Sequence, residues 1–350
     1  MFKKNKLFFP VTIILLVLVF LCAIAFGAVS ISVDDMFSAI KHALQHKKPA
    51  NIYEGVFLQI RLPRVLLCAI TGAVLSASGV LLQGLFRNPI VEPGLIGTSA
   101  GAAFGASIVF VLAVQMSEEM RSVAGSLLVP LFAFGGGLIA TFLVYSIARS
   151  QKKISVTSLL LVGIAINAIG LSGTGFMSYI ARDPQARSIT FWNLGTFSGA
   201  TWSQVAITGV VAAIVFIMSL RYSKQLNALI LGEEEATYMG VEPEKLKRRI
   251  MILTTAMVSV ATAFVGVISF IGLIVPHILR LLIGSDNKKL IPASMIMGAI
   301  LLLLADMGAR LLLAPAEVPI GIITSITGAP VFIFLLKKFN VLQEKGGSYA

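Results

Sequence analysis

Between Arg61 and Gly101 the chain reads RLPRVLLCAITGAVLSASGVLLQGLFRNPIVEPGLIGTSAG. The stretch is apolar, opens with two arginines, contains many Gly, Ala and Ser residues, and is interrupted by an Asn-Pro and a Pro-Gly pair. Small residues on a lipid-embedded helix indicate close packing against another helix. Broken backbone at membrane depth is tolerated only against protein or a water-filled cavity. The stretch therefore predicts a membrane-embedded helix beside a transport pathway.

The whole chain has the composition of a membrane protein. Of its 350 residues, 57% are hydrophobic and 13% are charged, and its mean hydropathy is +0.92; a soluble domain has about a quarter of its residues charged. Apolar segments run approximately over residues 7–29, 65–86, 94–114, 123–148, 155–180, 203–220, 250–274, 276–284, 290–313 and 318–336. This pattern predicts an all-α integral membrane protein of about ten transmembrane helices, folded as one polytopic domain over residues 1–350 without an appended catalytic module.

The basic residues indicate how the helices are oriented. The net charge is +12, but the 28 Lys and Arg residues lie in short groups between apolar segments, which argues against nucleic-acid binding. Roughly two thirds of them fall in the connections on one side, and the positive-inside rule assigns that side to the cytoplasm. Both termini are therefore expected in the cytoplasm. The two cysteines, Cys22 and Cys68, have no His or Cys neighbours at metal-ligand spacing, so neither a disulfide framework nor a zinc site is predicted.

The sequence carries no signature of an enzyme. It contains no GxSxG, HExxH, GxxxxGKS or GxxxxGKT motif. The ionisable candidates within or beside the apolar segments are Glu92, His277, Asp306 and Glu317, each beside a proline or near a segment end. Asp306 and Arg310 are four residues apart and can pair on one helix. No catalytic site, metal site or bound cofactor is predicted, and an ion-coupled carrier, which needs paired buried carboxylates, is a remote alternative.

Three arginines are exceptions to the positive-inside bias. Arg61 and Arg64 lie at the outer end of the second predicted span, and Arg310 lies at the outer end of the ninth. One interpretation is that they anchor helix ends to lipid phosphates. The other is that they form a docking surface for an acidic extracellular partner, because charges at the rim of an interface steer and orient association.

The largest cytoplasmic connection runs over residues 221–249 and reads RYSKQLNALILGEEEATYMGVEPEKLKRR. Acidic residues in a first turn and a glycine just beyond a last turn mark the ends of a helix. The segment therefore predicts a short helix that begins near Glu233 and stops at Gly240. This helix is interpreted either as a surface helix lying on the membrane or as a docking element for a cytoplasmic subunit.

Four motifs resemble one family of transporters. They are the stretch beginning RLPRVLL, the loop LGEEEATYMGV, the segment FVGVISFIGLIVPHILRLL, and LLLLADMGARLLLAPAEVPIGIITSITGAPVFIFLLKK. In this order they closely resemble the permease subunits of binding-protein-dependent ABC importers for iron chelates and cobalamin, the FecCD-type family. The resemblance implies a homodimer with a central translocation path, two cytoplasmic ATPase subunits that hold the ATP, an extracytoplasmic substrate-binding protein, and a location in the bacterial cytoplasmic (inner) membrane.

The resemblance also implies roles for particular residues. Docking of the binding protein is expected at Arg61, Arg64 and Arg310. Coupling to the ATPase is expected at Gly232, Glu233, Glu234, Glu235, Ala236 and Gly240. Gates along the path are expected at Asn88, Pro89, Ile90, Val156, Thr157 and Ser158, with an ordinary helix cap as the alternative for Thr157 and Ser158. The small residues between Gly72 and Gly105 are expected to line the path.

The substrate is predicted from the outer loop after the fifth span. Residues 181–202 read ARDPQARSITFWNLGTFSGATW, which looks most like the haem-importing branch of the family. An iron chelate is therefore expected, haem or a ferric siderophore, with cobalamin as the alternative. The two tryptophans are also typical of any membrane interface.

The chain also suggests an inverted repeat. Arg64 is followed by Pro89 at nearly the same spacing as Arg249 is followed by Pro276, and the two arginines are expected on opposite sides of the membrane.

Overall fold

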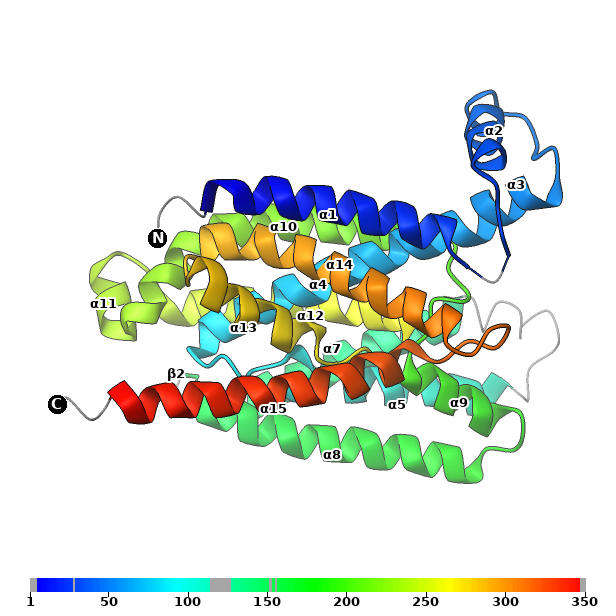
Figure 1. Cartoon of the computed structure of the whole chain (residues 1–350). Helices are drawn as coiled ribbons and strands as arrows, with labels where there is room; N and C mark the ends of the chain where they lie inside the picture. The colour runs from blue at the N-terminus through cyan, green and yellow to red at the C-terminus, as the bar shows by residue number, and fades with distance from the viewer. Residues whose placement is uncertain (1–4, 28, 114–126, 151–152, 155, 347–350) are drawn as a thin grey trace.

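The computed structural model describes residues 5–27, 29–113, 127–150, 153–154 and 156–346. Long helices form a bundle (Figure 1). They are α1 (Asn5–Ala25), α4 (Leu62–Phe86), α7 (Val129–Ala148), α8 (Val156–Ile180), α10 (Trp202–Leu231), α12 (Pro243–Val265), α14 (Asn287–Leu311) and α15 (Ile320–Gly346). Two shorter helices, α5 (Thr98–Leu112) and α13 (Ile271–Ile283), lie inside the bundle.

The expected number of spans is confirmed. Within the described residues, seven helices are long and apolar enough to cross a membrane, and three shorter apolar helices, Thr98–Leu112, Ile271–Ile283 and Ile320–Leu335, occupy the positions of the other three predicted spans. Parts of four predicted spans lie outside the described residues: residue 28 in the first, residue 114 in the third, residues 123–126 in the fourth and residue 155 in the fifth. The all-α prediction holds apart from a two-residue pairing of β1 (Arg149–Ser150) with β2 (Lys153–Ile154).

Smaller elements lie at the two ends of the bundle (Figure 1). α2 (Val33–Leu44), α3 (Ile52–Val56) and α9 (Gln185–Leu194) are at one end, called here the α2 end. α11 (Glu233–Tyr238) is at the other, the α11 end, where α1 starts and α15 finishes. The π-helical turn η1 (Phe57–Arg61) joins α3 to α4, and the 3₁₀ turn η2 (Pro93–Ile96) precedes α5.

The seventh predicted span is wrong in its boundary. The apolar segment 250–274 contains the end of α12, a non-helical stretch over residues 266–270, and the start of α13. Gly266 has a φ of 77°, and a side chain there would collide with the backbone carbonyl of Trp192. Phe270 also has a positive φ, 69°. An apolar run contains no hydropathy signal for such a break, because the break is fixed by packing against a distant segment.

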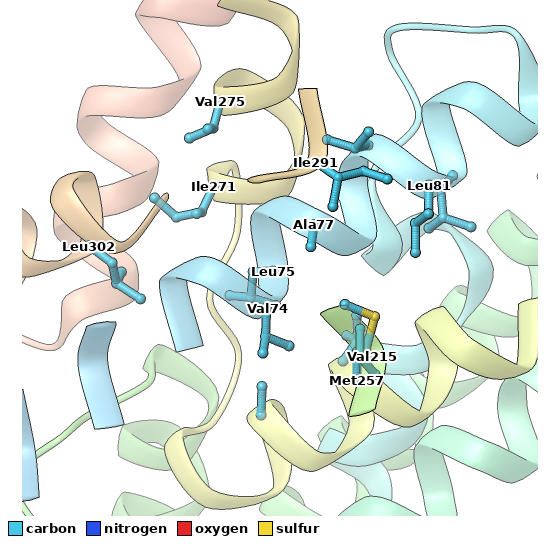
Figure 2. Close-up of a cluster of buried hydrophobic side chains, with 14 of the residues drawn as sticks. Val74, Leu75, Ala77, Leu81, Val215, Met257, Ile271, Val275, Ile291 and Leu302 are labelled. Carbon is cyan, nitrogen blue, oxygen red and sulfur yellow. The ribbon is translucent and has the colours of Figure 1, made fainter. Parts of the chain in front are cut away.

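Helix α4 is the centre of the fold. Nearly all of its residues are buried, whereas only about a fifth of the residues in the apolar windows of α1, α8 and α10 are buried. Figure 2 shows side chains of α4 among those of four neighbouring helices. The labelled residues are Val74, Leu75, Ala77 and Leu81 of α4, Val215 of α10, Met257 of α12, Ile271 and Val275 of α13, and Ile291 and Leu302 of α14.

The small residues of α4 pack against other helices of the same chain. A side chain at Gly79 would overlap the backbone carbonyl of Gly272 in α13, and one at Gly72 would overlap that of Gly298 in α14. Close backbone approach of this kind is the usual function of glycine between membrane helices. The expectation that these small residues line the path is therefore wrong for Gly72 and Gly79, because their open sides are filled by α13 and α14.

Candidate functional site

Five charged side chains gather at the α2 end, and all but Glu317 are buried; they are called here the arginine cluster: Arg61, Arg64, Asp306, Arg310 and Glu317. Nη2 of Arg64 donates to Oδ1 of Asp306 at 2.9 Å, and Nη1 of Arg64 donates to Oε1 of Glu317 at 2.7 Å. The Arg310 guanidinium lies 3.0 Å from Oδ2 of Asp306. The predicted pairing of Asp306 with Arg310 is thus confirmed, and Arg64 shares the same carboxylate.

Arg61 and Arg310 also bind the last turn of α1. The final carbonyls of a helix have no intrahelical donor and form the negative end of its dipole, so cations are favoured there. Arg61 donates to the carbonyls of Ile24 at 3.0 Å, Ala25 at 3.2 Å and Val29, and Arg310 donates to those of Phe26 at 2.9 Å and Ala23 at 3.1 Å. These contacts attach α1 to α4 and α14.

The three arginines face the protein rather than solvent or lipid. Arg61, Arg64 and Arg310 are 5–6% exposed, whereas the side chain of Glu317 is 39% exposed. A partner that approaches this surface meets Glu317 before it meets Arg64. Docking at the arginines stays a prediction, and their present partners are carboxylates and helix carbonyls.

At the α11 end, the predicted short helix is confirmed. α11 begins at Glu233, and Gly240 follows it with a φ of 80°. Glu233 accepts from the buried ammonium of Lys247 in α12 at 3.0 Å and lies 4.0 Å from the guanidinium of Arg87, the residue that ends α4. Lys247 also donates to Glu244 at 2.9 Å. One carboxylate therefore connects α11, α12 and the end of α4.

The predicted coupling residues divide into two groups. Ala236 is fully buried and Gly232 is buried, so neither is on the surface of this chain. Glu234, Glu235 and Gly240 are exposed, as are Tyr238 and Met239, which follow on the same turn. Contact of Ala236 with another subunit stays a prediction, and in this conformation its side chain is buried within the chain.

The first predicted gate segment follows directly on Arg87. Asn88 folds the chain back on itself, since its Oδ1 accepts from the backbone N–H of Ile90 at 3.0 Å. Asn88 and Pro89 are half-buried and Ile90 is exposed. This hydrogen bond fixes the turn that directly follows Arg87, the residue whose guanidinium lies near Glu233.

The second predicted gate segment lies in the first turn of α8, where Val156 and Ser158 are half-buried and Thr157 is exposed. Further along α8, its contacts are with η2, the turn that follows the first segment in the chain. Nδ2 of Asn167 donates to the carbonyl of Gly94 at 2.9 Å, and Gly163 packs against the carbonyl of Leu95. That the two segments form one gate stays a prediction.

Glu92 has a structural role at the break before α13. Its Oε1 accepts from the backbone N–H of Phe270 at 2.7 Å, and Gln83 donates to the carbonyl of Leu273 at 3.1 Å. Glu92 thus supplies a partner for backbone at the break, where no regular helix satisfies it, and Gln83 of α4 binds a carbonyl in the first turn of α13. Within the described residues, no group of three or more His, Cys, Asp or Glu side chains could hold a metal ion.

Arg87 and Lys247 are the residues of the site that sequence reasoning missed. In the sequence, each is one of many basic residues in the connections between apolar segments. The spacing of Glu244 and Lys247 does indicate a pair on one helix, but no local pattern relates either Lys247 or Arg87 to Glu233.

Comparisons with known proteins agree on the family. Residues 15–338 match the model of the FecCD transport family. The chain is 37% identical to the hemin transport system permease protein HmuU of Yersinia pestis over 95% of this chain and 96% of that one. It is 33% identical to the iron(3+)-hydroxamate import system permease protein FhuG of Bacillus subtilis, over 97% of this chain and 99% of that one.

A cobalamin relative and a solved structure complete the comparison. The vitamin B12 import system permease protein BtuC of Vibrio parahaemolyticus is 36% identical over 81% of this chain and 83% of that one. The structure of an ABC transporter assigned to the metal-chelate type, in an inward-facing conformation, has a TM-score of 0.79 and 32% identity, covering 95% of this chain and 99% of that one. This chain therefore belongs to the FecCD transport family and is a multi-pass permease subunit of an ABC importer, not an enzyme, with ATP hydrolysis on a separate subunit.

Proposed function

We propose that this permease imports an iron chelate, with haem as the first substrate to test. The observation that carries the proposal is the 37% identity to a hemin permease along almost the whole of both chains. The outer loop around α9, whose sequence resembles the haem-importing branch, lies at the α2 end. Ferric siderophores are the second candidate and cobalamin the third, since relatives of both kinds match the chain closely.

The experiment is reconstitution of the permease with its ATPase and binding protein in vesicles, followed by ATP-dependent uptake of haem, a ferric hydroxamate and cobalamin. The result expected is uptake of haem above that of the other two. Uptake of cobalamin alone would overturn the iron-chelate proposal, and uptake that persists without the ATPase would point to a different energy source.

The proposed assembly is a homodimer in the cytoplasmic membrane, with the α11 end and both termini in the cytoplasm. The surface of α8 supports a partner along its length. Its buried residues are Leu159, Gly163, Gly170 and Thr174, while large apolar side chains remain exposed on its other faces, among them Leu161, Ile164, Ile169, Leu171 and Phe176. If a second copy packed against one of these faces, the central path would lie between the two subunits.

The proposed coupling route runs from α11 through Glu233 to Arg87 and then to Asn88. The exposed side chains of α11, including Tyr238 and Met239, supply the surface for the ATPase. When the ATPase moves α11, the ion pairs of Glu233 carry that motion to the end of α4. The turn at Asn88 to Ile90 follows directly and is the proposed inner gate.

Replacing Glu233 with Gln is expected to reduce ATP-driven uptake while ATP hydrolysis continues. An ion pair with a partly exposed partner contributes about 0.2–1 kcal/mol, which predicts a loss of coupling of up to roughly fivefold. The measurement is the ratio of substrate transported to ATP hydrolysed. The matched control is Glu242→Gln, the same change on an exposed carboxylate of the neighbouring connection that pairs with the exposed Lys245. Equal ratios for the two variants would contradict the route.

The proposed docking surface for the binding protein is the exposed face of the arginine cluster. Glu317 already occupies one nitrogen of Arg64 there, so an acidic partner competes with it. Replacing Glu317 with Gln is therefore expected to tighten binding of the binding protein. An ion pair at an exposed site contributes about 0.2–1 kcal/mol, so the gain is up to roughly fivefold, and larger at low salt, where charges are screened less.

Binding is measured by titrating the labelled binding protein onto the reconstituted transporter at two salt concentrations. The matched control is Asp183→Asn, which removes an exposed acidic charge from the α8–α9 connection at the same end. A gain in affinity common to both variants would reflect net charge alone, and no gain in the Glu317 variant would argue against docking at Arg64.

A further inference from the structure

The large apolar residues of helix α2 face away from the rest of the protein. Val33, Phe37, Ile40 and Leu44 are 64%, 70%, 45% and 79% exposed. Their spacings of four, three and four residues place them in a single stripe, at about 100° per residue along a helix. A surface helix in water turns such a stripe towards its own protein.

The polar side of α2 is turned inward instead. Ser38 donates to Oε1 of Glu54 at 2.7 Å, Nδ1 of His42 lies 2.9 Å from Oε2 of Glu54, and Asn51 donates to Asp35 at 2.9 Å. Glu54 itself is 1% exposed. These contacts hold the hairpin formed by α2 and α3 together through hydrogen bonds, so the outward direction of the apolar stripe is fixed.

The N-terminus of α2 is also stabilised in place. Ser32 caps the helix, since its Oγ accepts from the backbone N–H of Asp35 at 3.1 Å, and its hydroxyl donates to the Asp35 carboxylate at 2.6 Å. That side-chain hydrogen bond, with a second from Asn51, lowers the pKa of the Asp35 carboxyl. The charged form of Asp35 therefore supports both α2 and its contact with α3.

The arginine cluster holds α2 close to the end of α1. The carbonyls of Phe26 and Val29, in the connection between the two helices, accept hydrogen bonds from Arg310 and Arg61. Four residues separate Val29 from Val33, and an extended chain spans at most about 3.5 Å per residue, so α2 starts within about 14 Å of that anchor. α1 has 21 residues, the length that crosses a bilayer, so its end marks the membrane surface.

The direction and charge of α2 fit the same position. In Figure 1, α2 lies past the end of α1, off the end of the bundle, and its axis is turned away from the direction of α1. Leu18 and Leu21, near the end of α1, are also exposed apolar side chains. Exposed basic residues follow on the same hairpin: Lys41, Lys47 and Lys48. Basic residues beside an apolar helix face are the pattern that binds lipid phosphates at a membrane surface.

We propose that α2 is an interfacial helix whose Val33–Phe37–Ile40–Leu44 stripe inserts into the headgroup and acyl boundary of the bilayer at the α2 end. Its lysines then lie at the level of the phosphates. The hairpin of α2 and α3 thereby anchors the start of α4, the central helix of the fold, to the membrane surface. This role depends on the membrane location of the chain and is independent of the substrate.

The experiment measures the depth of α2 in vesicles that contain anionic lipid. The exposed Cys22 is replaced by Ser, Cys68 stays because it is buried, and a nitroxide label is attached at Phe37→Cys, Leu44→Cys or Gln45→Cys in the full chain. Gln45 is the control because it is exposed and lies off the stripe. Collision with oxygen, which concentrates in lipid, is compared with collision with a water-soluble nickel chelate.

The labels at residues 37 and 44 are expected to have a several-fold higher ratio of oxygen to nickel accessibility than the label at residue 45. Equal ratios at the three positions would overturn the proposal. If both reagents were excluded from residue 37 and the labels of two molecules showed magnetic coupling, the stripe would contact a second copy of the chain. That result would overturn the proposal. Protection of residue 37 only after the binding protein is added would overturn it in favour of that protein.

Discussion

Replacement of Gly79 by Ala is expected to prevent the bundle from assembling around α4. A Cβ atom at this position would overlap the backbone carbonyl oxygen of Gly272, and backbone cannot rotate away as a side chain can. Overpacking of a close-packed interior costs about 1–3 kcal/mol and occasionally more. We expect a cost at or above the upper end, because α13 would have to move away from α4, and Gln83 would then lose its contact with Leu273.

The measurement is the yield of monodisperse protein from membranes and its thermal unfolding in detergent. The matched control is Gly84→Ala on the same helix, where the nearest atoms to a new Cβ, Asn287 Oδ1 and Leu226 Cδ2, are 3.6 Å away, an ordinary contact. The control is expected to keep its yield and unfolding temperature, since alanine favours helix over glycine. If both variants lost yield and unfolding temperature to a similar extent, the loss could not be assigned to the overlap with Gly272, and the prediction would be contradicted.

Replacement of Asp306 by Asn is expected to be the most destabilising change in the arginine cluster. Asp306 is 1% exposed and is the carboxylate shared by Arg64 and Arg310. Removal of one partner from a buried ion pair costs about 3–5 kcal/mol, because the remaining charge is left without compensation. Asn has nearly the same shape as Asp, so the loss of stability reflects the missing charge and not a change in side-chain volume. We expect α1 to lose its attachment together with the cluster.

Thermal unfolding of the purified protein measures this cost, and protease cleavage of the connection after α1 reports the loosening of α1. Glu317→Gln is the control, because Glu317 contacts Arg64 at similar distance but is partly exposed, where an ion pair contributes about 0.2–1 kcal/mol. A variant at Asp306 as stable as the control would show that Glu317 and the helix carbonyls alone compensate the arginines.

Local sequence patterns predict a large part of this molecule. Apolar runs give the number of spans, because bilayer thickness fixes how many apolar residues a crossing helix needs. The three glutamates and Gly240 predict α11, because acidic residues and glycine stabilise opposite helix ends. The pair of Asp306 and Arg310 follows from a separation of four residues. Each of these signals is contained in a few neighbouring residues.

Other features depend on residues that are far apart in the chain. Arg64 reaches Asp306 across 242 positions, which turns arginines expected at a docking surface into buried partners of a carboxylate. At the break after Val265, Gly266 packs against the carbonyl of the distant Trp192, and Arg87 belongs to the site through Glu233. The sequence by itself determined that the chain crosses the membrane about ten times and to which family it belongs. Only the tertiary structure decided which charges are buried, where α12 ends and that α2 turns its apolar stripe outward, because each depends on contacts between distant segments.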